Sequence, residues 1–373
     1  MSNLTRKKFL NLSLAALAGL ALAGLTACFN RINPINIINT AAAASSTTSS
    51  KTTDGSNSEE KPLDESTSTS TKRKEETAKK AIIGIAGGES SVSVLVAKAI
   101  ELAGGLGFIK KGSTVLIKPN LNTGDPHPAS TNPEVVYEVI NLVKKQNPYR
   151  ILVGDRSGFW LNTIDCMKKS KIYEAAESAG AEVFPFDDEE WVQVKPKEAK
   201  NWPGGYSVPQ ILIDADYVIS VPVLKTHSIA NFSIAIKNWV GILYSKDRIA
   251  GLHPFGRDKE VFGSKLAELH LSRLPSFIVT DCTRVFTEGG PTNGKAVDVN
   301  MVYATSDIIA NDVLGLAILK TLGTIDTIQD NSPWTHPQIK RAVELGLGIS
   351  DYTKMEINPY NVSNMDLILS GIR

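Results

Sequence analysis

The stretch Tyr217–His227 (YVISVPVLKTH) joins an apolar run to a charged ending. Its first part, 217–221, is apolar apart from one serine, which is typical of a strand buried inside a sheet. Lys225 and His227 follow and are two positions apart, so on an extended segment they share one side. A lysine beside a histidine suits acid–base chemistry or anion binding. The alternative is an ordinary surface loop.

Working outward from this stretch, short apolar runs alternate with helical patterns over residues 81–373. The predicted strands are 81–86, 114–118, 150–154, 182–186, 217–221, 277–280 and 301–304. The predicted helices are 91–102, 132–146, 170–179, 229–243, 264–272 and 308–322. Strands that alternate with helices indicate βαβ units. We therefore predict an α/β fold, with a mostly parallel sheet flanked by helices in a Rossmann-like layered architecture.

Five of the predicted strands end in polar or charged clusters. These clusters begin at Lys118, Asp155, Lys225, Asp281 and Thr305, the last of which runs through Ser306 to Asp307. In open α/β sheets, ligands bind outside the carboxyl ends of the strands. We predict that the five clusters meet at one edge of the sheet and form a ligand site. The alternative is that they are helix caps and turns, which would account well for Ser306 and Asp307.

The residue types in these clusters suggest roles in binding and catalysis. We assign catalytic roles to His227, Lys225, Lys237 and Asp281, with the lysines gripping an anionic group and the histidine transferring protons. We assign substrate binding to Lys118, Asn120, Asn122, Asp155, Asn238, Gly289 and Gly290. Asp155, Asp281 and Asp312 are candidate ligands for a metal ion that binds oxygen atoms. Lys237 lies in an otherwise apolar helical stretch, so it either snorkels to the surface or faces a site.

Three groups of motifs carry a resemblance to a known family. The first is Ile117-Lys118-Pro119-Asn120, and the second is the stretch Val221–His227 followed by IKNWVG at 236–241. The third is Gly289-Gly290-Pro291 with Gly294, then Ser306-Asp307 and Asn311-Asp312. In order and spacing, residues 81–346 resemble the domain of unknown function 362 family. The resemblance implies no general activity, and a redox or isomerising reaction is the class that family association suggests.

The cysteines depart from that family pattern. Many members append ferredoxin modules with Cys-x-x-Cys runs, whereas this chain has only Cys28, Cys166 and Cys282 and no such run. An iron–sulfur cluster is therefore not expected, and the cofactor stays unassigned with a metal ion as an open alternative. The sequence does not identify a redox partner.

The first 28 residues are typical of an export signal. Arg6, Lys7 and Lys8 precede an apolar run at 12–25, too short for a comfortable membrane span. The run ends in Leu25-Thr26-Ala27-Cys28, which resembles a lipobox, so we predict lipidation of Cys28. The alternative is an ordinary anchor with an incidental cysteine. Residues 5–11 resemble a twin-arginine signal with Lys7 or Lys8 in place of the second arginine, and the general secretory route is the other possibility.

The domain organisation follows from composition. Residues 29–80 are rich in Ser, Thr, Lys and Glu and are predicted to be a disordered tether. Residues 81–373 are predicted to form a single α/β domain. The resulting protein would be exported and held by lipid on the extracytoplasmic face of a bacterial membrane.

Net charge excludes one class of partner. The 373-residue chain has 40 basic and 39 acidic residues, and residues 1–80 hold 11 and 7 of these, so the body has a net charge of −3. A nucleic-acid binder held by bulk charge is therefore excluded. We expect an enzyme that acts on a small anionic substrate. The alternatives are a tethered ligand-binding lipoprotein without catalysis and a structural lipoprotein.

Overall fold

The computed structural model describes residues 80–158 and 160–373. The predictions for the export signal, for Cys28 and for the tether up to residue 79 lie outside the described residues. Within them, no helix is both long and apolar enough to span a bilayer.

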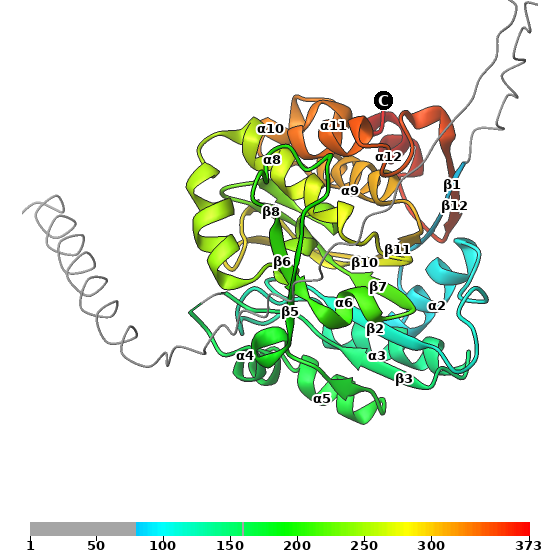
Figure 1. Ribbon diagram of the computed structural model, residues 1–373. Helices are drawn as coiled ribbons and strands as arrows, with labels where there is room; N and C mark the ends of the chain where they lie inside the picture. The colour runs from blue at the N-terminus through cyan, green and yellow to red at the C-terminus, as the bar shows by residue number, and fades with distance from the viewer. Residues whose placement is uncertain (1–79, 159) are drawn as a thin grey trace, which may run out of the picture. The chain divides into compact units, whose positions relative to one another are not determined.

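A ten-stranded sheet organises the described residues (Figure 1). The strands are β1 (Ala81–Ala86), β2 (Thr114–Pro119), β3 (Arg150–Val153), β4 (Glu182–Val183), β7 (Tyr217–Val221), β8 (Val223–His227), β9 (Asn231–Ser233), β10 (Phe277–Gly289), β11 (Gly294–Thr305) and β12 (Met355–Tyr360). Their order is β12-β1-β11-β10-β7-β2-β3-β4, with β8 paired to β10 and β9 paired to β8. A separate hairpin pairs β5 (Trp191–Val194) with β6 (Tyr206–Pro209).

Most neighbouring strands run parallel, which confirms the predicted sheet type. β2 pairs in parallel with β3 and β7, and β10 pairs in parallel with β7 and β8. β11 is antiparallel to both β10 and β1. The carboxyl end of β11 therefore lies at the edge opposite to the carboxyl ends of β2, β3 and β7.

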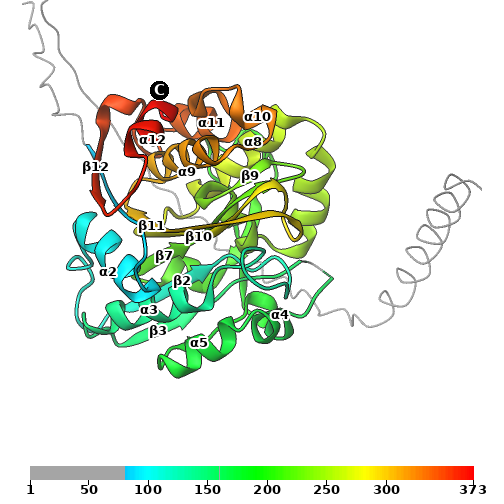
Figure 2. The ribbon, with the colours of Figure 1, turned by 180° about the vertical axis from the view of Figure 1, so that it is seen from behind.

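Helices cover both faces of the sheet (Figures 1 and 2). The helices are α2 (Val92–Leu102), α3 (Pro133–Lys144), α4 (Thr163–Lys169), α5 (Ile172–Ser178), α6 (Gln210–Asp214), α7 (Ala235–Asn238), α8 (Lys259–Glu268), α9 (Ile308–Leu322), α10 (Asp326–Gln329), α11 (Pro337–Glu344) and α12 (Met365–Gly371). One apolar cluster lies between the sheet and α2, α3 and α5, and a second lies between the sheet and α8, α9 and α11. Successive side chains of a strand point to opposite faces of the sheet, so they enter the two clusters in turn. On β2, Ile117 belongs to the first cluster and Leu116 to the second.

Local signals set several helix ends as the sequence predicts. The Asn132 side chain accepts a hydrogen bond from the Glu134 N–H at 3.0 Å, and Pro133 begins α3. Asp307 caps the start of α9, and Gly323, which has a positive φ, follows its last turn.

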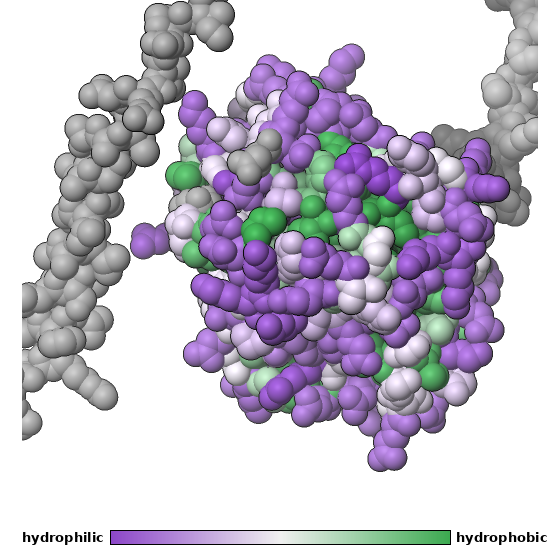
Figure 3. Space-filling model, turned by 90° about the horizontal axis from the view of Figure 1, so that it is seen from below, coloured by the Kyte–Doolittle hydropathy of each residue, from purple (hydrophilic) through white to green (hydrophobic). Residues whose placement is uncertain are grey.

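The lower face of the molecule, seen from below in Figure 3, is mainly hydrophilic, with hydrophobic residues visible between the polar ones. This is the pattern expected of helices that turn polar faces to solvent.

One predicted helix was wrong, and several predicted strands have other bounds in the structure. The helix predicted over 229–243 is instead strand β9, the four-residue helix α7 and a 3₁₀ turn at Trp239–Ile242. Residues 232–236 and 238–243 are all buried, so their apolar pattern does not distinguish a strand from a helix. The strand predicted at 277–280 extends to Gly289, because it pairs with β11 along the whole hairpin. Asp281 therefore lies inside a strand rather than after one.

Candidate functional site

A cavity lies at the carboxyl ends of β2, β3 and β8 and encloses about 350 Å³, part of which is open to solvent. Seven predicted site residues line it: Asn120, Asn122, Asp155, Lys225, His227, Lys237 and Asn238. Its other lining residues include Arg156, Ser233, Gly241, Arg248 and Pro291. This position agrees with the usual location of ligands in open α/β sheets. We call it the strand-end pocket.

A buried ion pair lies beneath this pocket. The Lys118 ammonium is 2.7 Å from Asp155 Oδ1, and both side chains are almost fully buried. Asp155 also accepts hydrogen bonds from the Leu121 and Arg156 N–H groups, at 2.9 and 2.8 Å. Burial lowers the pKa of Lys118 and raises the pKa of Asp155, and their mutual attraction opposes both shifts. Lys118 itself does not line the pocket, so it supports Asp155 rather than contacting a ligand there.

Glycine at position 241 makes room for this ion pair. A Cβ atom on Gly241 would lie 1.9 Å from Asp155 Oδ1 and 2.7 Å from Lys118 Nζ. No larger residue would fit there without moving the pair. The close approach brings the backbone that follows α7 directly against the carboxylate.

Two asparagines connect the ion pair to Lys225. The Asn120 amide donates to Asn238 Oδ1 at 3.1 Å, and its own oxygen accepts from the Lys225 ammonium at 2.9 Å. Asn238 in turn donates to Ser220 Oγ at 3.1 Å. Lys225 also donates to the Ala129 carbonyl. Both amides are thus held in one orientation, and they place the Lys225 ammonium in the pocket.

The pKa of Lys225 is lowered to about 7, chiefly by burial and then by the positive charge of Lys237. No carboxylate in the described part of the chain forms an ion pair with it. At neutral pH this lysine is therefore divided between its charged and neutral forms. Such a group can both accept and donate a proton.

Strand geometry places His227 on the same side as Lys225, as the two-residue spacing predicts, and both line the pocket. Its Nδ1 accepts hydrogen bonds from the N–H groups of Ile229 and Ala230, at 3.1 and 3.3 Å. Nδ1 therefore carries no proton, and the neutral ring holds its proton on Nε2. Burial, with the nearby lysines, lowers the pKa of His227 well below its usual value. The ring is thus a neutral hydrogen-bond donor.

Lys237 is half-buried on α7 and lines the pocket. Among residues 80–158 and 160–373, its ammonium group has neither a hydrogen-bond acceptor nor a carboxylate within bonding distance. Burial lowers its pKa to about 7, and the charges of Arg248 and Lys118 act in the same direction. An ammonium group without a partner inside a pocket is available to a ligand.

Asp312 lies outside the pocket and positions α7. Its carboxylate accepts from the N–H groups of Ala235 and Ile236, at 2.8 and 3.1 Å, and so caps the helix that carries Lys237. Burial raises the pKa of Asp312 to about 7. This contact comes from α9, 77 residues further along the chain.

Asp281 is also outside the pocket, although it was predicted to be catalytic. It is fully buried and lies 3.0 Å from His127 Nε2. It also accepts hydrogen bonds from the N–H groups of Asn132 and Thr283, at 2.8 and 3.0 Å. Burial alone would raise the pKa of Asp281, but His127 and these donors outweigh it and the pKa is lowered. Asp281 thus anchors the segment before α3, whose Ala129 carbonyl holds Lys225.

The three aspartates proposed as metal ligands do not form a common metal site. In the described ranges, no three His, Cys, Asp or Glu side chains are grouped so that they could hold a metal ion. Asp155, Asp281 and Asp312 each have their own donors, as given above. Their separation follows from the fold, because Asp155 follows β3, Asp281 lies within β10 and Asp312 lies on α9.

The remaining predicted residues support the pocket from outside it. Gly289 and Gly290 have positive φ angles in the β10–β11 hairpin, and a Cβ on Gly290 would lie 2.0 Å from the Thr226 carbonyl oxygen. They bring Pro291 into the pocket lining but do not line it themselves. Ser306 and Asp307 follow the antiparallel strand β11 and lie at the opposite edge of the sheet, so the prediction of one common edge was wrong for this cluster.

Two arginines were missed by sequence reasoning. Arg248 lies on a π-helical turn at Asp247–Leu252 and donates to the Ser157 carbonyl and to Asn122 Oδ1, at 2.8 and 3.0 Å. Its buried Nε has no acceptor in the described structure. Arg156 directly follows Asp155 in a strand-end cluster, so its position was a usable signal. Arg248 lies in a segment without a periodic pattern of apolar residues, so the sequence gave no signal for it.

Comparisons with known proteins agree with the motifs. The profile of the family described as "Domain of unknown function (DUF362)" matches residues 115–317. A thylakoid-associated protein of Synechocystis sp. is 27% identical over 232 residues, which cover 59% of this chain and 68% of that protein.

Two solved structures share a weaker likeness. The lactate racemase apoprotein of Thermoanaerobacterium thermosaccharolyticum matches with a TM-score of 0.39 and 15% identity, over 58% of this chain and 53% of that one. A Thermotoga maritima protein matches with a TM-score of 0.36 and 13% identity, over 57% of this chain and 53% of that one. The chain thus spans about half the length of the solved structures it matches. The family match covers more than half of the chain and includes every strand that forms the pocket, and the protein belongs to the DUF362 family.

Proposed function

We propose that the strand-end pocket binds a small anionic ligand. The observation that carries this proposal is Lys237, whose ammonium group lines the pocket without any acceptor in the described structure. Lys225 and Arg248 add positive charge, and Asp155 is already neutralised by Lys118. A pocket with this surplus of positive charge attracts an anion and repels a cation.

We further propose that the bound anion undergoes an acid–base reaction of the isomerising class. Lys225 and Lys237 both have a pKa of about 7, so each can exchange a proton at neutral pH. His227 presents a fixed Nε2–H, which suits stabilisation of a developing negative charge on a substrate oxygen. In this proposal His227 donates a hydrogen bond, and a lysine performs the proton transfer first assigned to the histidine.

The alternative is a ligand-binding protein without catalysis. Lys225 is already bonded to Asn120 and to the Ala129 carbonyl, which favours a fixed cation over a mobile acid–base group. Exchange in D₂O separates the two functions. Small 2-hydroxy and 2-oxo acids are incubated with the full chain, and NMR follows deuterium at C2 of the hydroxy acids and at C3 of the oxo acids. An enzyme incorporates deuterium, whereas a binder does not.

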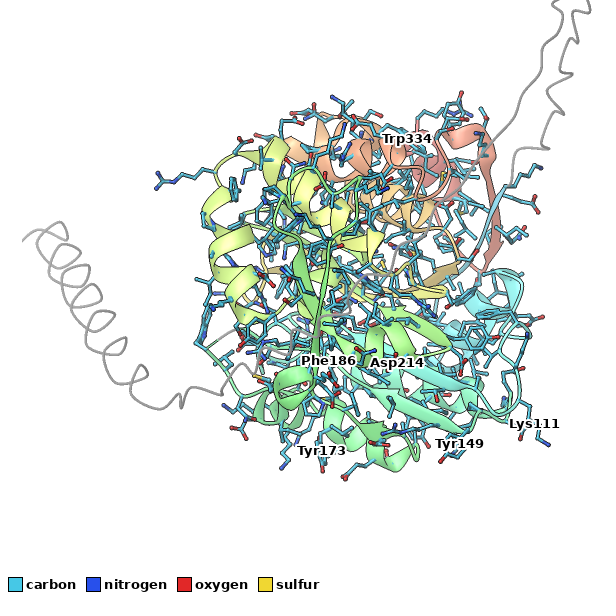
Figure 4. The ribbon with its side chains drawn as sticks, in the orientation of Figure 1. Lys111, Tyr149, Tyr173, Phe186, Asp214 and Trp334 are labelled. Atoms are coloured by element: carbon cyan, nitrogen blue, oxygen red, sulfur yellow. The ribbon has the colours of Figure 1, made fainter. Side chains whose placement is uncertain are left out.

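Binding itself is tested by thermal melting of the full chain with inorganic phosphate, acetate and malonate. We expect at least one anion to raise the melting temperature of the natural protein. Lys237→Gln should weaken that anion's affinity at least about tenfold, which corresponds to about 1.4 kcal/mol. Lys111→Gln is the matched control, because Lys111 is exposed and points away from the molecule (Figure 4). Equal anion responses in both variants would contradict the proposal.

We also propose that the protein is exported and anchored to a bacterial membrane through lipidated Cys28. The support is the basic start of the chain, the apolar run at 12–25 and the lipobox-like ending. Cells that express the full chain are given a labelled fatty acid, and the label is expected on the natural protein but not on Cys28→Ala. Label that persists in the variant would exclude this site of attachment.

A further inference from the structure

The strand-end pocket holds several cations, but their surroundings differ. Lys225 donates to Asn120 Oδ1 at 2.9 Å and to the Ala129 carbonyl. Arg248 is held by Ser157 and Asn122 and keeps one buried N–H, at Nε, without an acceptor in the described structure. These two groups are fixed donors for an anion. Within the described residues Lys237 makes no such bonds, so its nitrogen remains free for another purpose.

A lysine becomes a nucleophile when its amine is neutral, and this requires burial or cationic neighbours. Lys237 has both: it is half-buried, and Arg248 and Lys118 are its charged neighbours. Because the pKa of Lys237 is about 7, about half of the Lys237 amines are neutral at pH 7. For an ordinary lysine the neutral fraction at this pH is below about one in a thousand. Asp312 caps α7 and fixes the helix that carries this side chain.

We infer that Lys237 forms an imine with the carbonyl carbon of a small 2-oxo acid. This inference rests on the proposed function, because the carboxylate of the same molecule would occupy the anion position beside Arg248 and Lys225. The enclosed part of the pocket is small, which favours an acid of a few carbon atoms. Imine formation at Lys237 would give the strand-end pocket a specific chemistry and a class of substrate.

The reaction balances without any further reagent. The neutral Lys237 amine attacks the carbonyl carbon, and one amine proton moves to the carbonyl oxygen. The Nε2–H of His227 donates to that oxygen as its negative charge develops. The oxygen then leaves as water with the second amine proton, and a carbon–nitrogen double bond remains. The imine makes the neighbouring C–H more acidic, and this is the bond that an isomerising reaction would break.

Reductive trapping tests this inference. The full chain is incubated with pyruvate and cyanoborohydride, and intact mass followed by peptide mapping locates any carboxyethyl group. We expect one adduct, at Lys237, with an occupancy at least about tenfold above that of Lys111, in line with its larger neutral fraction. Mapping in the natural protein locates the adduct without any variant, so it does not depend on how a variant folds.

Lys237→Arg supplies the matched comparison, because arginine keeps the positive charge but cannot form the imine. This variant should lose the adduct, while the rise in melting temperature with phosphate is judged on the natural protein. Lys111→Gln should keep both. If the natural protein responds to phosphate but shows no adduct at Lys237, or an even spread over surface lysines, the imine is excluded and anion binding stands. If phosphate, acetate and malonate all have no effect on the melting temperature, anion binding itself has failed.

Discussion

Lys118 and Lys237 lie close to the same pocket, yet only Lys118 has a carboxylate partner for its charge in the described structure. Lys118, from β2, is fully buried and has Asp155 at 2.7 Å, Asn238 and a carbonyl as partners. Lys237, from α7, is half-buried and has no partner in the described structure. A buried charge without a partner is costly, so natural proteins pair such charges or give them a function. The comparison separates a cation that supports the pocket from a cation that serves a ligand.

The largest effect should come from Asp155→Ala, which leaves Lys118 buried without its carboxylate. Removal of one partner of a buried ion pair costs about 3–5 kcal/mol. The free energy of unfolding, measured with urea, should fall by that amount. Glu182→Ala is the control, because its pair with Arg150 is exposed and should contribute less than about 1 kcal/mol. Equal losses in the two variants would remove the distinction between the paired and unpaired lysines.

A smaller effect is expected from Gly241→Ala. The new Cβ would occupy the position of Asp155 Oδ1, so the ion pair has to move. Overpacking of this kind costs about 1–3 kcal/mol, and the displaced Asp155 should also weaken anion binding. Gly107→Ala is the matched control, because nothing lies within 4 Å of a Cβ at that position. A fully stable Gly241→Ala that binds normally would show that the close approach is unimportant.

The two pocket lysines without a carboxylate partner should also make the free energy of unfolding depend on pH. In the folded state Lys225 and Lys237 have a pKa of about 7, while in the unfolded chain both titrate near 10.4. Between these values the unfolded chain binds more protons, so the free energy of unfolding should rise as the pH increases from 7 towards 10. Each lysine adds at most about 1.4 kcal/mol per pH unit.

Lys237→Met tests this dependence directly. The variant should show a shallower rise over the same pH range, and at pH 7 it should be as stable as the natural protein or more so, because a buried charge has been removed. Urea unfolding at several pH values measures both quantities. An unchanged slope would mean that Lys237 titrates as an ordinary surface lysine, and its contrast with Lys118 would disappear.

Several parts of the fold could be predicted because their signals are local. The bounds predicted for β1, β7 and α9 agree with the structure, since apolar runs and capping residues lie within a few positions of each end. The shared side of Lys225 and His227 follows in the same way from the two-residue period of a strand. The helix predicted over 229–243 was wrong because 232–236 and 238–243 are all buried, and in such a run the periodicity of apolar residues carries no information.

The site was predicted less completely because its contacts connect distant parts of the chain. Arg248 contacts Asn122, which lies 126 positions earlier in the chain, and no sequence pattern near Arg248 predicts that contact. Asp281 has the residue type of a catalytic acid, but the pairing of β10 with β11 places it beside His127 and away from the pocket. Residue type and position after a strand cannot separate a lining residue from a supporting one.

The sequence by itself determined the α/β class, most of the strands and the set of charged residues that could serve a site. It also carried the motifs of the family. Only the tertiary structure decided the direction of β11, which sends Asp307 to the far edge of the sheet, and decided which lysine has a carboxylate partner. The physical reason is that secondary structure depends on neighbours along the chain. The pairing of buried charges depends instead on contacts such as that between Lys118 and Asp155, which exist only when separate strands lie side by side.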